Sequence, residues 1–139
     1  MDGHDDGWRR RAVTAAVAVP ALVMLVAGAW CWLDPSGFAV ATRWPPHDHF
    51  LRDAGAFQMG LGLIGLAALR WRDLVAVVLT AGAATNGLHA VNHIADSAGG
   101  GRAADPWFLG GLAALCAAGL VLRLRPSRRT DRDRVRARG

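Results

Sequence analysis

Four long apolar stretches, separated by polar segments, dominate the pattern of hydrophobic and polar positions along the chain. They cover residues 12–33, 50–69, 74–95 and 107–124. A helix needs about 20 residues to cross the roughly 30 Å hydrocarbon core of a bilayer, and each stretch is near that length. Backbone groups in lipid must be hydrogen-bonded internally, so each stretch is predicted to be an α-helix. We therefore expect an all-α polytopic membrane protein, an antiparallel bundle of four transmembrane helices within residues 12–124.

The segments between these stretches set the expected connections. Residues 70–73 form a very short link, so the second and third spans are predicted to make an antiparallel helical hairpin. The segment from Asp34 to His49 is rich in turn residues and is expected to be a loop, as is the glycine-rich segment 97–102. Asp105 and Pro106 are typical of a helix N-cap followed by a first-turn proline.

Small residues recur on the predicted helices at spacings that let helix backbones approach closely in lipid. Such a face favours packing within one bundle, although it could equally serve a homo-oligomer. Pro20 lies inside the first span, where it can kink the helix and leaves one carbonyl group for a neighbouring helix or water to satisfy. The small residues are Gly55, Gly60, Gly62 and Gly65 in the second span and Gly110, Ala114 and Ala118 in the fourth.

The distribution of arginine predicts the orientation in the membrane. The chain has 139 residues, 53% of them hydrophobic, and it contains arginine but no lysine. All arginines except Arg43, Arg52 and Arg102 precede the first span, lie between the second and third, or lie at or beyond the end of the fourth. The positive-inside rule then places the N-terminal segment, residues 1–11, and the tail, residues 125–139, in the cytoplasm.

The six tryptophans agree with this orientation, because all of them fall near predicted membrane interfaces, where tryptophan is enriched. We therefore expect a multi-pass protein of the cell (inner or plasma) membrane. The arginine-rich tail lacks an apolar face and is predicted to be disordered. Because the charges crowd at the ends of apolar runs, the tail is expected to touch anionic lipid headgroups rather than nucleic acid.

A polar stripe interrupts the third span. Asn86, His89, His93 and Asp96 fall within an arc of about 80° on one helix face, and Asn92 flanks them. Ionisable side chains inside a membrane span are costly and by default indicate a functional site. The stripe is therefore the first candidate for function.

A second polar group lies at the outer end of the second span. Since this span enters the membrane from the side at which the stripe ends, we expect the two groups to meet in the outer leaflet. Gln58 lies further in, at a depth close to that of His89. Asp48 could instead simply cap the second span, with His49 in its first turn. The group comprises His47, Asp48, His49, Arg52 and Asp53.

Three interpretations of these two groups are open, and the first is a metal site. His89 and His93, at positions i and i+4 of one helix, can both reach one ion. A tetrahedral set of nitrogen and oxygen ligands would suit zinc or copper. The remaining ligands would come from His47 or His49 and from Asp96 or Asp48.

The second interpretation is a haem or quinone between the second and third spans. Two histidines on one helix cannot ligate a haem from opposite faces, so His49 would have to supply the second nitrogen. In the third interpretation the polar residues only hold the helices together, through interhelical contacts of about 0.6–2 kcal/mol each. Those contacts would be hydrogen bonds among Asn86, His89 and Gln58 and an ion pair between Arg52 and Asp96.

The chain offers no motif of a common enzyme class. Cys31 and Cys116 lie at depths that differ by about 10 Å, so a disulfide between them is not expected. No Cys-x-x-Cys, nucleophile–base pairing, phosphate-binding loop or dinucleotide-binding motif is present. The sequence thus disfavours a thiol oxidoreductase, a hydrolase, a kinase or a soluble dehydrogenase.

The run from His49 to Gly62, followed by the link Arg70–Asp73 and the segment Asn86–Asp96, resembles a group of small uncharacterised actinobacterial four-span membrane proteins. The resemblance covers residues 45–124. More loosely, the four-helix layout resembles the DoxX-like and DUF4345-like membrane families. DoxX-like proteins are linked with membrane oxidoreductase complexes, which implies a redox component as one alternative, but none of their catalytic motifs can be placed on this chain.

Taken together, these patterns favour a non-enzymatic protein over an enzyme. We expect an accessory or ligand-binding membrane subunit with an outward-facing cluster of His, Asp and Asn that can bind a metal ion. Its partners would be the lipid bilayer and another membrane protein or a second copy of the chain. The alternatives are a haem- or quinone-associated redox component and a purely structural four-helix membrane protein.

Overall fold

The computed structural model describes residues 3–96, 98–99 and 101–125, and every regular element in that part of the chain is helical. The all-α prediction is thus confirmed. The predicted disorder of the tail falls on residues that lie, apart from Arg125, outside the described ranges. The elements in order are α1 (Gly3–Leu33), α2 (Pro35–Thr42), α3 (Asp48–Arg70), the 3-10 helix η1 (Arg72–Leu74), α4 (Val75–Ala95) and α5 (Asp105–Leu124).

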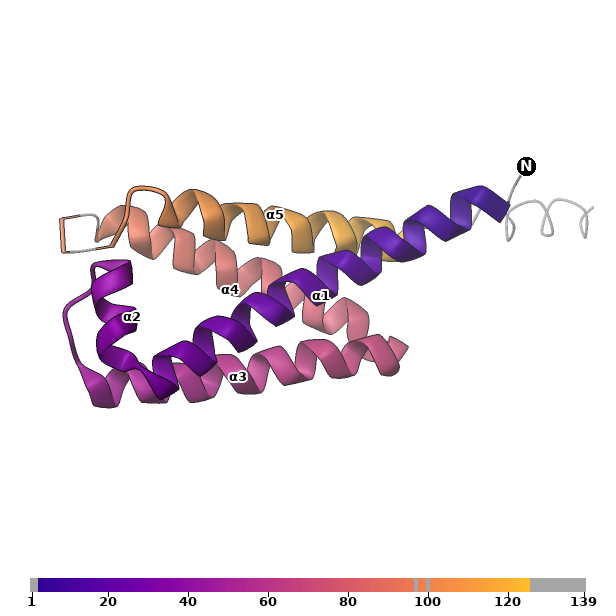
Figure 1. The fold of residues 1–139 in the computed structure, drawn as a ribbon. Coiled ribbons are helices and arrows are strands. Elements are labelled where there is room, and N and C mark those ends of the chain that lie inside the picture. The colour runs from indigo at the N-terminus through magenta and orange to yellow at the C-terminus, as the bar shows by residue number, and fades with distance from the viewer. Residues whose placement is uncertain (1–2, 97, 100, 126–139) are drawn as a thin grey trace, which may run out of the picture.

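The long helices form two antiparallel pairs (Figure 1). α1 packs along α3, α4 packs along α5, and α1 also crosses onto α5. We call the end of the molecule that carries η1 the η1 end, and the opposite end, which carries α2, the α2 end. The Nε of Arg9 donates to the carbonyl oxygen of Leu122 at 2.7 Å, so the start of α1 and the end of α5 are neighbours at the η1 end.

Three segments have the length and apolarity of membrane-spanning helices. They are Gly7–Leu33, Arg72–Ala95 and Asp105–Leu124. Large apolar side chains on their outward faces, such as Val26, Leu88 and Val121, are exposed where lipid would cover them. These features define a helical membrane protein. α3 falls short on hydropathy, because it contains Gln58, four glycines and charged residues at both ends.

Glycines bring α1 and α3 into close contact. A Cβ on Gly55 would lie 2.6 Å from the carbonyl oxygen of Gly28, and a Cβ on Gly28 would lie 2.7 Å from the carbonyl oxygen of Gly55. The crossing therefore requires glycine on both helices. Gly62 and Gly65 also pack against α1, whereas a Cβ added to Gly60 would meet nothing within 4 Å. The predicted packing role of small residues is confirmed for three of the four glycines in this helix.

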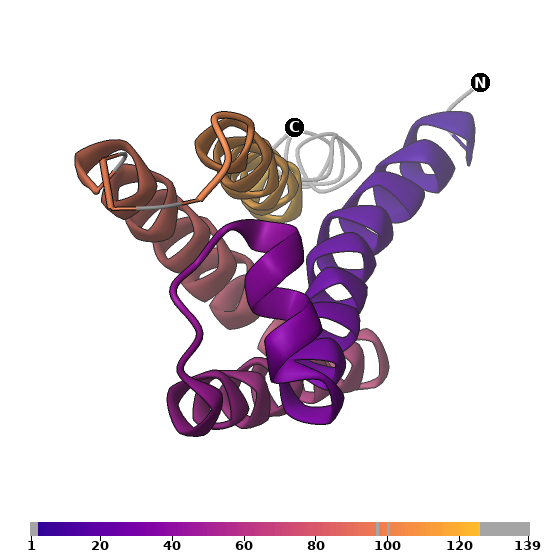
Figure 2. The ribbon, with the colours of Figure 1, turned by 60° about the vertical axis from the view of Figure 1, so that its left-hand side comes forward.

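The predicted hairpin of the second and third spans needs correction. The short link forms η1 and the two helices run antiparallel, as expected. However, α3 and α4 contact each other little and diverge toward the α2 end (Figures 1 and 2). The glycine-bearing face of α3 packs on α1 instead, so a helix distant in the chain takes the place of the neighbour in sequence.

Pro20 lies inside α1 without ending the helix. Proline lacks an N–H, so the carbonyl oxygen of Ala16 loses its donor four residues on. The thiol of Cys116 in α5 donates to that oxygen, with an Sγ–O distance of 3.8 Å. The expectation that a neighbouring helix satisfies the freed carbonyl is confirmed. The buried core around this contact comprises Ala16, Val17, Ala68, Val75, Leu79 and Cys116.

A short helix, α2, occupies much of the segment predicted to be a loop between the first two spans. Asp34 caps it by accepting a hydrogen bond from the backbone N–H of Gly37 at 2.9 Å, and Pro35 occupies the first turn. Arg43, with a φ of 62°, ends the helix in the left-handed conformation. The loop prediction was wrong here because an N-cap followed by proline was read only as a turn, although the same pair is a helix start.

Candidate functional site

Two histidines of α4 face each other near the α2 end. His89 and His93 are one helical turn apart, and their Nε2 atoms are separated by 3.2 Å. The ring centroids lie 4.8 Å apart, with the ring planes inclined by 48°. The i, i+4 spacing puts both side chains on one face of the helix, and the structure directs their nitrogens toward each other. These two members of the predicted stripe are therefore brought together.

Asp105, the first residue of α5, lies against His93 from the neighbouring helix. Its Oδ2 is 3.9 Å from Nδ1 of His93. Arg102 holds the carboxylate, since its backbone N–H donates to Oδ2 at 2.8 Å and its Nε donates to Oδ1 at 3.3 Å. A carboxylate beside Nδ1 favours the tautomer that carries its proton there. The lone pair of His93 Nε2 is then directed at His89.

The segment between α2 and α3 closes the site over His93. The ring of Trp44 meets the His93 ring edge to face, with centroids 5.3 Å apart. The backbone N–H of Gly101 donates at 3.0 Å to the carbonyl oxygen of Arg43, the residue before Trp44. The side chains of His93 and Asp105 are only 8% and 16% exposed, whereas His89 is exposed. The site is thus covered on the Asp105 side and open on the His89 side.

The second polar group does not join this pair. His47 is the N-cap of α3, and its Nδ1 accepts a hydrogen bond from the backbone N–H of Phe50 at 3.3 Å. His49 pairs with Asp53 across one turn at 3.5 Å. The start of α3 and the end of α4 lie apart in both views (Figures 1 and 2). The cap predicted at Asp48 is one residue earlier, and Asp48 begins the helix.

The other members of the stripe make local contacts. Asn86 is buried, and its Nδ2 donates to the carbonyl oxygen of Gly82 at 2.8 Å within its own helix. Asn92 and Asp96 are exposed. Asp96 is the C-cap of α4, and its backbone N–H donates to the carbonyl oxygen of Asn92. None of these contacts reaches a second helix, so they stabilise α4 itself.

The remaining two polar residues of α3 contact α1. Arg52 donates from Nη1 to the carbonyl oxygen of Trp32 at 3.3 Å, so its guanidinium serves the last turn of α1 rather than Asp96. Gln58 is half-buried, and its Cβ lies where a side chain on Gly28 would have to be. The close α1–α3 packing explains both placements, because it turns this face of α3 away from α4.

The geometry of the histidine pair suits two kinds of contact. Without an ion, one imidazole donates its Nε2 proton to the other. Two nitrogens bound to one tetrahedral zinc ion at about 2.0–2.1 Å would lie about 3.3 Å apart, close to the observed 3.2 Å. No cluster of three or more His, Cys, Asp or Glu side chains suited to a metal ion occurs in the described residues. The pair therefore offers two ligands and leaves the other positions to water or to another molecule.

Sequence reasoning did not assign the partners of His93 to the site. Asp105 was expected to cap the fourth span, but the N-cap of α5 is Ala104, and the Asp105 side chain accepts from Arg102 instead. For Trp44, the sequence pattern predicts only a position at the membrane interface. One signal was present: a short connection must bring the start of α5 beside the end of α4, so a carboxylate there lies near the last histidine of the stripe.

No protein-family model, curated protein or solved structure matches the chain. The resemblance to small actinobacterial four-span proteins, and more loosely to the DoxX-like and DUF4345-like families, stays a prediction.

Proposed function

We propose that α3 is a fourth membrane span. α1 and α4 run in the same direction, so the chain must return to the η1 end between them, and α3 makes that return. Its 23 residues extend about 34 Å at 1.5 Å per residue, enough to cross the hydrocarbon core. Its outward face exposes apolar side chains, as a lipid-facing helix does. They are Phe57, Leu61, Leu63 and Ile64.

The charge distribution supports a cytoplasmic η1 end, and hence cytoplasmic termini. Arginines crowd at that end, while the α2 end carries only three in the described ranges, Arg43, Arg52 and Arg102. The positive-inside rule assigns the arginine-rich side to the cytoplasm. The histidine pair then lies toward the outer face of the cell membrane. Five of the arginines at the η1 end lie close together: Arg9, Arg10, Arg72, Arg123 and Arg125.

Cysteine labelling in intact cells tests this orientation. Ala103→Cys, in the connection before α5, should react with a membrane-impermeant maleimide added outside. Asp73→Cys, in η1, should react only after the cells are opened. Both positions are exposed, so accessibility within the protein is matched. Labelling of Asp73→Cys from outside would contradict the orientation.

The protein is, in this proposal, a non-enzymatic accessory or ligand-binding membrane subunit whose His89–His93 pair binds zinc or copper. The observation that carries the proposal is the 3.2 Å separation of the two Nε2 atoms. Imidazole nitrogen suits both metals. Asp105 supports it further, because a carboxylate behind a ligating histidine favours the tautomer that leaves the other ring nitrogen free to bind the metal.

The open side of the pair favours an accessory role. Two protein ligands leave a tetrahedral ion with two positions free, and His89 faces outward from the bundle. Water, a small ligand or a side chain of a partner protein can occupy those positions. A site of this kind can accept an ion and pass it on, which a closed four-ligand site does poorly.

A purely structural role is the second candidate. His93 packs on Trp44 and meets Asp105, so it joins α4 to α5 and to the segment before α3 without any ion. The two candidates differ at His89, whose exposed ring adds little to that packing. Truncation of His89 should therefore abolish metal binding while leaving the metal-free fold intact.

Isothermal titration of the purified protein with Zn²⁺ or Cu²⁺ separates the two candidates. We expect saturable binding by the wild-type protein and loss of that binding in His89→Ala. His49→Ala is the matched control, because it removes another exposed histidine near the same end of the molecule. Equal metal binding by the wild-type protein and His89→Ala would contradict the metal site and favour the purely structural role.

A further inference from the structure

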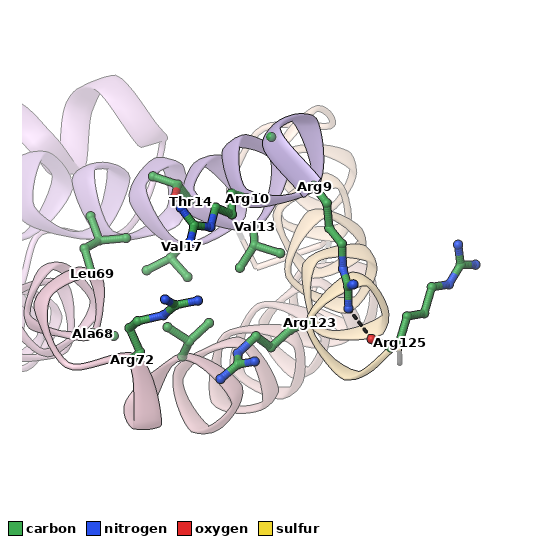
Figure 3. Close-up of a pocket in the computed structure, with 12 residues that line it drawn as sticks. Arg9, Arg10, Val13, Thr14, Val17, Ala68, Leu69, Arg72, Arg123 and Arg125 are labelled. Carbon is green, nitrogen blue, oxygen red and sulfur yellow. Dashed lines mark hydrogen bonds between the residues drawn. The ribbon is translucent and has the colours of Figure 1, made fainter. Parts of the chain in front are cut away.

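A cavity of about 740 Å³ lies among the helix ends at the η1 end, opposite the end that carries the histidine pair (Figure 3). Its walls come from the start of α1, the last turns of α3, η1, the first residue of α4 and the end of α5. The volume falls within the roughly 300–1,000 Å³ that is typical of small-molecule sites. The proposed metal site uses no part of it.

Five arginines line this arginine cavity, and none of its lining residues is acidic. In Figure 3, Arg10 and Arg72 extend into the space beside Val17 from different elements. The ion pairs of the described residues involve none of the five. Positive charges gathered in one concave space repel each other and attract an anion. The five are Arg9, Arg10, Arg72, Arg123 and Arg125.

One of these arginines already has protein partners. Arg9 donates to the carbonyl oxygens of Leu122 and Arg125, where a cation at the end of α5 is favourable. Within the described part of the chain, Arg10, Arg72 and Arg123 have no hydrogen-bond acceptor for their side chains. No described residue therefore competes with a ligand for the guanidinium donors of these three arginines.

The rest of the cavity lining is largely apolar, and this indicates which kind of anion fits the cavity. Val13 and Val17 of α1, Ala68 of α3 and Val75 of α4 line the cavity between the charged groups. A small hydrated anion gains nothing from such a wall. A phosphate group attached to a hydrocarbon chain can pair with the arginines while its first methylene groups cover the apolar side chains.

We propose that the arginine cavity binds a phosphate group, and that the ligand is an anionic phospholipid. Guanidinium groups match phosphate oxygens with paired hydrogen bonds, and basic pockets between membrane helices hold lipid headgroups in this way. The four-span topology places the cavity at the cytoplasmic leaflet, where anionic lipids attract basic segments. Binding in detergent does not depend on that topology or on the metal site.

Native mass spectrometry of the full-length protein in neutral detergent tests the proposal with phosphatidylglycerol as the probe and phosphatidylcholine as its zwitterionic counterpart. Arg10→Gln and Arg72→Gln each remove a lining guanidinium. Arg11→Gln and Arg70→Gln remove neighbouring exposed arginines that do not line the cavity. We expect the lining variants to lose about fivefold or more in phosphatidylglycerol affinity and the controls to stay within about twofold.

Competition with inorganic phosphate identifies the source of the phosphate group. Phosphatidylglycerol binding that persists in millimolar phosphate supports the lipid. Phosphate binding that depends on Arg10 and Arg72, without preference for phosphatidylglycerol, supports a soluble phosphate compound at the same site. Equal losses in lining and control variants, or no binding of either probe, would overturn the proposal. Arg72→Lys keeps the charge and should retain more binding than Arg72→Gln, which separates ligand loss from misfolding.

Discussion

The thiol of Cys116 donates to the carbonyl oxygen of Ala16, the oxygen that Pro20 deprives of its helical N–H donor. This contact joins α5 to α1 inside the buried core. Gly82 of α4 leaves room for the sulfur, because a Cβ there would lie 2.8 Å from Sγ. A proline within a membrane helix is thus accommodated by a donor from another helix.

Cys116→Ala should lower the stability of the bundle by about 1–2 kcal/mol, because the Ala16 carbonyl loses its donor and a small void opens. Pro20→Ala restores an N–H to α1, so in that background Cys116→Ala should cost about half as much or less. Thermal unfolding of the four proteins in detergent measures the coupling. The same loss in both backgrounds would show that the thiol does not serve this carbonyl.

Gly55→Ala should separate α1 from α3 and destabilise the protein by about 1–3 kcal/mol, because the added Cβ would meet the backbone of Gly28 at 2.6 Å. Gly60→Ala is the matched control on the same helix, since a Cβ there has no neighbour within 4 Å. It should leave stability unchanged or raise it by up to about 1 kcal/mol. Equal effects of the two substitutions in a detergent unfolding assay would argue against the observed α1–α3 crossing.

Asp105→Asn should weaken metal binding about tenfold or more, because it removes the negative charge that lies 3.9 Å from Nδ1 of the ligating His93. Asp53→Asn is the control, because Asp53 meets His49 rather than the pair. Titration with Zn²⁺ measures both affinities. An unchanged Zn²⁺ affinity in Asp105→Asn would show that Asp105 does not contribute to metal binding.

The helices were predictable from sequence because their signals are local. The position of each helix follows from long apolar runs and the charged links between them. The contact face of α3 follows from small residues that recur within a few turns. α2 shows the limit of that approach, since Asp34 and Pro35 could begin either a turn or a helix. Only packing of its buried residues Pro35 and Ala39 distinguishes the two.

Only the part of the candidate site that depends on local signals could be predicted from the sequence. His89 and His93 share a helix face, so the i, i+4 rule brings them together without knowledge of the fold. The expected partners His47 and His49 depended on α3 packing along α4. The Gly28–Gly55 contact draws α3 onto α1 instead. Which of several small-residue faces pairs with which cannot be derived from spacing alone.

Electron paramagnetic resonance of the Cu²⁺-loaded protein tests the central claim most directly, because it reports the nitrogen ligands of the ion. The wild-type protein should show coupling to two imidazole nitrogens. His89→Ala should show one, or lose the ion, and His47→Ala and His49→Ala should keep two. A wild-type spectrum without histidine nitrogens, or an unchanged spectrum in His89→Ala, would contradict the claim that the His89–His93 pair is a metal site.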